Sequence, residues 1–140
     1  MKYPYSMRVR ARVLVAAFVV AYAASPILAQ QRLIVIGGGK RPADAMKRFV
    51  EWAGGAKARI LVITWASGEP EASFNALKDS VVDYKPASVE ASPDKPLDAN
   101  SRKRFLSQIE SATGVFFTGG DQNRIMDVLK DDDLLRIIRQ

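Results

Sequence analysis

The sequence contains neither cysteine nor histidine among its 140 residues. Without cysteine, disulfide bonds are excluded, and without both residue types Cys/His zinc sites are excluded as well. The absence of histidine also removes the general base that most often activates a serine nucleophile. We expect no metal ion and no cofactor from the residues that remain.

Acidic residues are missing from the first 29 positions, although the chain has 15 of them. The same stretch carries four of the 21 basic residues, so residues 30–140 contain 17 basic and 15 acidic residues, a net charge of +2. So small an excess does not provide the basic surface that nucleic-acid binding requires. We therefore expect no nucleic acid among the partners.

The basic start ends at Arg12 and is followed by an uncharged apolar run over residues 13–24. A break at Pro26 and the small residue Ala29 complete a pattern typical of a secretory signal peptide, with cleavage after Ala29. The run is shorter than the about 20 apolar residues that span a bilayer. Retention as an uncleaved anchor is the alternative. We expect a signal peptide at residues 1–29, export to the periplasm or the extracellular space, and no stable membrane anchoring after cleavage.

Residues 30–140 alternate between short apolar runs and segments with helical periodicity. The apolar runs predict strands at residues 32–36, 59–64, 87–91 and 114–118. The periodic segments predict helices that begin near Pro42, Pro70, Asp98 and Asn123. The acidic triplet at residues 131–133 favours the start of a last helix over a metal site, because adjacent side chains point in different directions.

This alternation predicts a single α/β domain with a mostly parallel sheet and helices on both faces. Continuous rather than alternating apolarity favours strands that are covered on both sides. In such a sheet the loops after Ile36, Thr64 and Thr118 lie on one rim, where open α/β sheets bind ligands.

The first of these loops is Gly37-Gly38-Gly39, followed by Lys40. It matches neither G-x-x-x-x-G-K-[ST] nor G-x-G-x-x-G, since Pro42 occupies the place of the third glycine. We predict a tight turn that leaves room for a neighbouring loop. A nucleotide-binding domain stays the less favoured alternative.

The second loop contains Trp65 and Ser67. Ser67 lacks the G-x-S-x-G context and has no histidine to act as its base, so we interpret it as a loop or helix-capping serine. Trp65 is either the wall of a pocket or a packed aromatic, and the second interpretation is favoured.

The third loop, Gly119-Gly120-Asp121-Gln122, is the most informative part of the sequence. The two glycines predict a sharp turn, and Asp121 can cap the following helix. Free backbone N–H groups at such a turn can bind an anion or an oxyanion, and the Gln122 amide can hold a substrate carbonyl or amine. The alternative is an ordinary tight turn between a strand and a helix.

Three blocks of the sequence resemble, in order and spacing, the amino-terminal half of the cyanophycinases. The blocks are residues 33–39, 60–67 and 114–125. These proteins are serine peptidases related to peptidase E. The resemblance implies a three-layer α/β/α domain over residues 30–140, like that of class I glutamine amidotransferases and incomplete at its C-terminus.

The resemblance also implies a role for each loop. The residues Gly119, Gly120, Asp121 and Gln122 would form the oxyanion hole and the substrate pocket, with Gly37, Gly38, Gly39, Trp65 and Ser67 at the rim of the pocket. The family's nucleophile is a serine on a G-x-S-A-G elbow, which is expected after Gln140. No catalytic residue is therefore expected in this chain, and we predict that it is inactive alone.

The implied activity is hydrolysis of peptide or isopeptide bonds in peptides of the Asp/Arg type, such as cyanophycin or another acidic or arginine-containing peptide. This chain has Lys40-Arg41 where family members commonly carry an acidic residue, which bears on substrate preference. A homodimer is one candidate assembly. The alternatives to a peptidase are a non-catalytic binding module of the same fold and a decayed gene fragment.

Overall fold

The computed structural model describes residues 31–130 except residue 38, together with residues 136 and 138. The predicted signal peptide, Gly38 and the acidic triplet lie outside the described residues. In the described part of the chain, no helix is long and apolar enough to cross a membrane.

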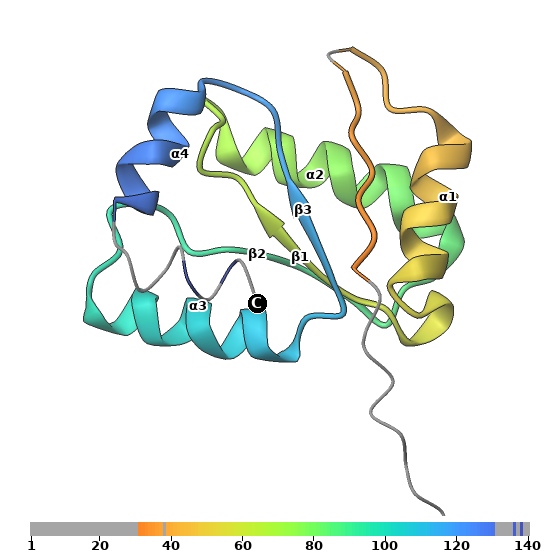
Figure 1. The fold of residues 1–140 in the computed structure, drawn as a ribbon. Helices are drawn as coiled ribbons and strands as arrows, with labels where there is room; N and C mark the ends of the chain where they lie inside the picture. Colours follow the sequence, from red (N-terminus) through yellow and green to blue (C-terminus); the bar gives the residue numbers. More distant parts are fainter. Residues whose placement is uncertain (1–30, 38, 131–135, 137, 139–140) are drawn as a thin grey trace, which may run out of the picture. The chain divides into compact units, whose positions relative to one another are not determined.

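The sheet has three parallel strands, β1 (Arg59–Ile63), β2 (Ser88–Ala91) and β3 (Gly114–Phe117), in the order β2-β1-β3 (Figure 1). Ile60 of β1 is aligned with Gly114 of β3 and with Val89 of β2. The strands predicted at residues 59–64, 87–91 and 114–118 are thus confirmed to within one residue at either end.

The helices are α1 (Ala43–Trp52), α2 (Pro70–Val81), α3 (Ala99–Ser111) and α4 (Gln122–Leu129). Two 3₁₀ turns follow the first two helices, η1 at Gly55–Lys57 and η2 at Val82–Tyr84. The start of α4 is set as predicted, since the Asp121 carboxylate accepts a hydrogen bond of 2.9 Å from the backbone N–H of Asn123.

The central strand β1 carries a hydrophobic core on each of its faces. Ile60 and Val62 belong to a cluster with α1 and α2, whose buried members are Met46, Val50, Leu77 and Val81. Leu61 and Ile63 face the other way and pack with Trp65 and with Phe105 of α3. Because successive strand residues point to opposite faces, this double burial explains the continuous apolar run and confirms the three-layer α/β arrangement.

The prediction of a strand at residues 32–36 is wrong, because this segment is extended but is not part of the sheet. It lies beside β3 in Figure 1. Ile36 packs against the core cluster of α1 and α2, whereas Leu33 and Val35 are 84% and 83% exposed. An apolar run alone does not reveal whether other residues cover both faces of the segment, and within the described residues only one face is covered.

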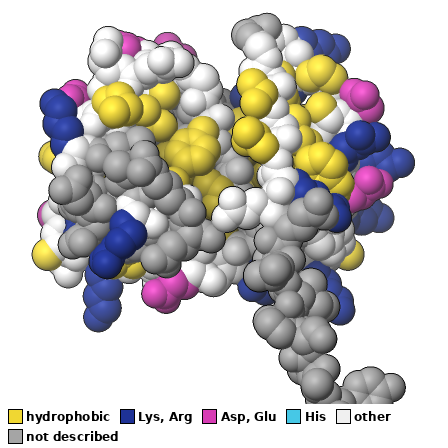
Figure 2. All heavy atoms as spheres, in the orientation of Figure 1, with side chains coloured by type: hydrophobic (Ala, Val, Ile, Leu, Met, Phe, Trp, Pro, Cys, Tyr) yellow, Lys and Arg dark blue, Asp and Glu magenta, His cyan; other side chains and the backbone are white. Residues whose placement is uncertain are grey.

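Three large hydrophobic residues of this segment and of β3 are exposed, namely Leu33, Val35 and Phe117. Figure 2 shows hydrophobic side chains along this segment and on the neighbouring β3. Phe117, the last residue of β3, is 42% exposed.

Candidate functional site

The carboxyl ends of three parallel strands lie at one edge of the sheet. The loops that leave this edge are residues 64–69 after β1, residues 92–98 after β2 and residues 118–121 after β3, and we call them together the rim. Direct contacts between these loops, described below, show that residues distant in sequence meet there, as expected for an open parallel sheet.

The closest contact on the rim is between Gly120 and Ala66. A Cβ atom on Gly120 would lie 2.0 Å from the Ala66 carbonyl oxygen, and the φ of Gly120 is 147°, which side chains rarely adopt. The neighbouring backbone N–H of Asp121 donates to the same oxygen at 2.9 Å. Glycine is therefore required at position 120 by a backbone approach as well as by the turn itself.

The hydrogen bonds of the turn decide which N–H groups are available to a ligand. The N–H groups of Thr118 and Asp121 donate to the carbonyls of Ile63 and Ala66, at 3.0 and 2.9 Å. Asp121 is therefore not a free backbone donor, although the resemblance to cyanophycinases implied that it belongs to the oxyanion and substrate site. Its carboxylate is also engaged, as the cap of α4.

Among the described contacts, no internal acceptor is recorded for the backbone N–H groups of Gly119, Gly120 and Gln122. All three residues are exposed. The side chain of Gln122 also makes no recorded contact in this part of the chain. The turn thus offers two adjacent glycine amides and one side-chain amide to a ligand, at the positive end of α4.

Ser67 makes the hydrogen bonds of a turn-forming serine. Its Oγ lies 2.7 Å from the Oγ of Ser73 and accepts a bond of 3.0 Å from the backbone N–H of Glu69. No carboxylate or amine contact to this hydroxyl is recorded among the described residues. Nothing in this geometry activates Ser67 as a nucleophile.

Trp65 does not line the rim of a pocket, and that expectation is corrected here. Its side chain is only 2% exposed, its ring centroid lies 4.8 Å from that of Phe105, and its Nε1–H donates to the Pro93 carbonyl at 2.9 Å. The packed-aromatic interpretation is therefore the one that applies. Trp65 joins the loop after β1 to the loop after β2 from inside the core.

No contact between the first glycine loop and the third is recorded within the described residues. Gly37 and Gly39 are exposed, and no atom lies within 4 Å of the position of an added Cβ on either. The side chain of Arg41 is directed to other elements, since it donates to the Ala76 carbonyl of α2 at 3.4 Å and lies 5.7 Å over the Phe116 ring. A shared site of the two glycine loops remains a prediction.

A small cavity lies at the opposite end of the sheet, between Arg59, Ser88 and Ser111. Its volume of about 20 Å³ suffices for one water molecule. This cavity borders the start of β1 and not the rim, so it has no part in the site that the three loops form.

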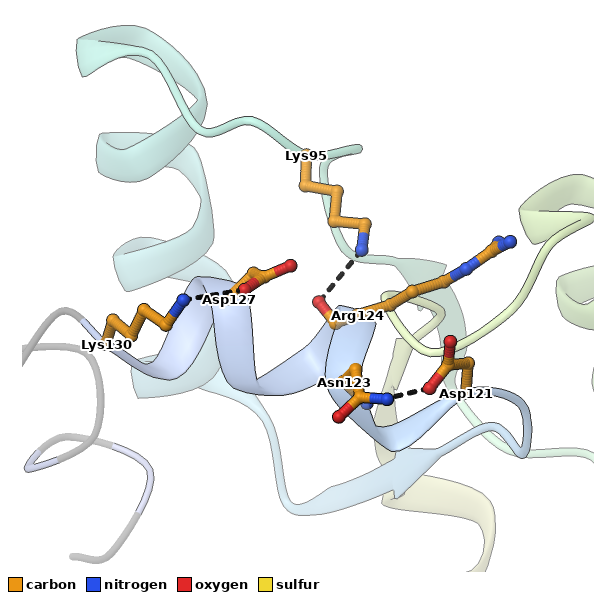
Figure 3. Close-up of polar contacts among 6 residues, drawn as sticks. All are labelled: Lys95, Asp121, Asn123, Arg124, Asp127 and Lys130. Atoms are coloured by element: carbon orange, nitrogen blue, oxygen red, sulfur yellow. Dashed lines mark hydrogen bonds and ion pairs between the residues drawn. The ribbon is translucent and has the colours of Figure 1, made fainter.

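Lys95 of the rim and Arg124 of α4 are residues that the sequence did not single out, and both contact the rim loops (Figure 3). The Arg124 guanidinium donates to the Ser67 carbonyl at 3.2 Å, and Lys95 Nζ donates to the Arg124 carbonyl at 2.8 Å. Further along α4, the bond from Lys130 lowers the pKa of the Asp127 carboxyl, an exposed pair outside the rim. No spacing in the sequence distinguishes Arg124 from other helical arginines.

These residues define a three-layer α/β unit with a glycine turn and free amides at the carboxyl edge of a parallel sheet. Its sequence is similar to those of cyanophycinases, as the resemblance predicted. It is 34% identical over 116 residues to the cyanophycinase of Geminocystis herdmanii (strain PCC 6308), which covers 77% of this chain and 41% of that protein. It is 29% identical over 119 residues to the cyanophycinase of Trichormus variabilis (strain ATCC 29413 / PCC 7937), which covers 83% of this chain and 40% of that protein.

The cyanophycinase of Synechococcus elongatus is 30% identical over 110 residues, 76% of this chain and 34% of that protein. The chain is thus similar to an amino-terminal portion of cyanophycinases and spans only about 40% of the length of the first two relatives. No protein-family model matches the chain, and no match was found among solved structures.

Proposed function

We propose that this polypeptide supplies the oxyanion-binding and substrate-binding part of an exported, cyanophycinase-like serine peptidase. The observation that carries the proposal is the turn at Gly119-Gly120, which is fixed to Ala66 while its own amides have no recorded partner. The similarity to cyanophycinases supports the reaction class.

In the proposed reaction, a serine outside these 140 residues attacks the acyl carbon of a peptide or isopeptide bond. The carbonyl oxygen gains negative charge in the tetrahedral intermediate, and the N–H groups of Gly119 and Gly120 donate to it. Fixed donors of this kind stabilise the transition state because they need no reorganisation when the charge develops. The exposed amide of Gln122 orients the substrate.

Two features of this chain support the proposal that the nucleophile belongs to another part of the polypeptide. It has no histidine in its sequence, and the hydroxyl of Ser67 is engaged with Ser73 and the Glu69 amide. The proposed substrate is a peptide of the Asp/Arg type, which rests on the similarity to cyanophycinases.

The test is a hydrolysis assay with cyanophycin and with a β-aspartyl-arginine dipeptide. The purified 140-residue chain is expected to release no product. A longer polypeptide, in which this chain is joined to the portion that the relatives possess beyond it, is expected to hydrolyse one or both substrates. Replacing Gln122 with Ala in that longer polypeptide should raise KM more than it lowers kcat.

Two results would contradict the proposal. Turnover by the 140-residue chain would place the nucleophile within it. A longer polypeptide that hydrolyses neither substrate but still binds the dipeptide through Gln122 would favour a non-catalytic binding module of the same fold.

A further inference from the structure

Arg124 reaches with its side chain from α4 to one of the three rim loops. It lies on α4, yet its Nη1 donates to the carbonyl of Ser67 in the loop after β1, at 3.2 Å. The same nitrogen lies 3.2 Å from where a Cβ on Gly68 would be, so the guanidinium rests directly against the backbone of that loop. Figure 3 shows the side chain extending from α4 toward it.

The backbone of Arg124 connects to the remaining two loops. Its carbonyl accepts a bond of 2.8 Å from Lys95 Nζ, which belongs to the loop after β2. Its N–H donates to the Asp121 carbonyl, at the end of the loop after β3, at 3.1 Å. All three rim loops are therefore joined through one residue, and two of these bonds have a charged donor, which strengthens them.

The contact with Ser67 acts on the candidate oxyanion site through Ala66. Ala66 directly precedes Ser67, and its carbonyl accepts the Asp121 N–H and lies against Gly120. A shift of the Ser67 peptide would turn the Ala66 carbonyl and, with it, the two glycine amides. We propose that Arg124 is a positioning residue, which sets the direction of the Gly119 and Gly120 N–H groups; their use as oxyanion donors rests on the proposed function.

The experiment measures amide hydrogen exchange and amide resonances by NMR in the ¹⁵N-labelled full chain. In Arg124→Met, which preserves helix propensity, the amides of Ser67 and Asp121 should exchange about 5 to 10 times faster, as expected for loss of one exposed hydrogen bond of ordinary strength. The resonances of Gly119 and Gly120 should shift. Arg124→Lys keeps one charged donor and should restore most of the protection.

The matched control is Arg48→Met, which removes an exposed arginine of α1 that has no recorded contact among the described residues. It should change neither the exchange rates nor the glycine resonances. The proposal is overturned when Arg124→Met behaves like Arg48→Met, or when Arg124→Lys is as unprotected as Arg124→Met. Neither measurement needs hydrolysis, so this test can be carried out even if the proposed peptidase activity is absent. Equally, a negative result for Arg124 would not contradict the proposed peptidase activity.

Discussion

Replacing Gly120 with Ala should strongly destabilise the chain. The added Cβ would lie 2.0 Å from the Ala66 carbonyl oxygen and 2.5 Å from its carbon, far inside van der Waals contact, and both are backbone atoms. The substituted residue would also have to keep a φ of 147° or move away from it. Either response disturbs the bond between the Asp121 N–H and Ala66.

The magnitude follows from two contributions. A residue forced into a backbone region that glycine alone populates costs about 1 to 3 kcal/mol. Loss of the hydrogen bond to Ala66 adds about 1 kcal/mol. The free energy of unfolding should therefore fall by about 2 to 4 kcal/mol, which lowers the urea midpoint by about 1 to 2 M for a domain of this size.

The assay is urea unfolding followed by far-UV circular dichroism, and the chain provides its own control at the preceding residue. An added Cβ on Gly119 meets no atom within 4 Å, and its φ is not in the region reserved for glycine. Gly119→Ala should change the stability by no more than about 0.5 kcal/mol. Equal effects of the two substitutions would refute the argument that the contact with Ala66 makes position 120 special.

Three further changes test other parts of the structure. Asp98 accepts hydrogen bonds from Ser101, the side-chain bond above all, and these bonds lower the pKa of the Asp98 carboxyl. The stability that the ionised carboxyl contributes is complete above its unfolded pKa of about 3.9 and is lost as the pH falls through the folded pKa. Thermal midpoints between pH 2 and 5 should therefore depend less on pH in Asp98→Asn. Gly114→Ala places a Cβ 2.8 Å from that of Ala53, so chemical denaturation should show a loss of about 1 to 3 kcal/mol from overpacking, and an unchanged midpoint would contradict the close contact. Trp65→Phe leaves the Pro93 carbonyl without its donor and should cost about 1 to 3 kcal/mol in the same assay, whereas a neutral change would show that this bond is unimportant.

The sequence correctly predicted a strand where both faces of the strand are buried. The apolar residues of β1 pack against helices on each side of the sheet, as a continuous apolar run predicts. Residues 32–36 have the same composition, but Leu33 and Val35 are exposed, because what covers a strand depends on elements outside it. Pattern alone does not distinguish the two cases.

The candidate site was predictable where the backbone itself demands a residue type. The Gly119-Gly120 turn and the Asp121 cap have local signatures, and the structure contains both. The contacts of Trp65 and Arg124 depend on how the loops after three different strands meet. Since strand order and register determine those contacts, no local spacing could have revealed them.

The central claim is that the Gly119–Gln122 turn receives the carbonyl and amide groups of a peptide substrate. The most direct measurement is an NMR titration of the ¹⁵N-labelled chain with a β-aspartyl-arginine dipeptide. Saturable shifts of the Gly119 and Gly120 backbone amides and of the Gln122 side-chain amide are predicted, and the Gln122→Ala variant should bind more weakly. Saturable binding that leaves these resonances unchanged, or that is unaffected by Gln122→Ala, would contradict the account.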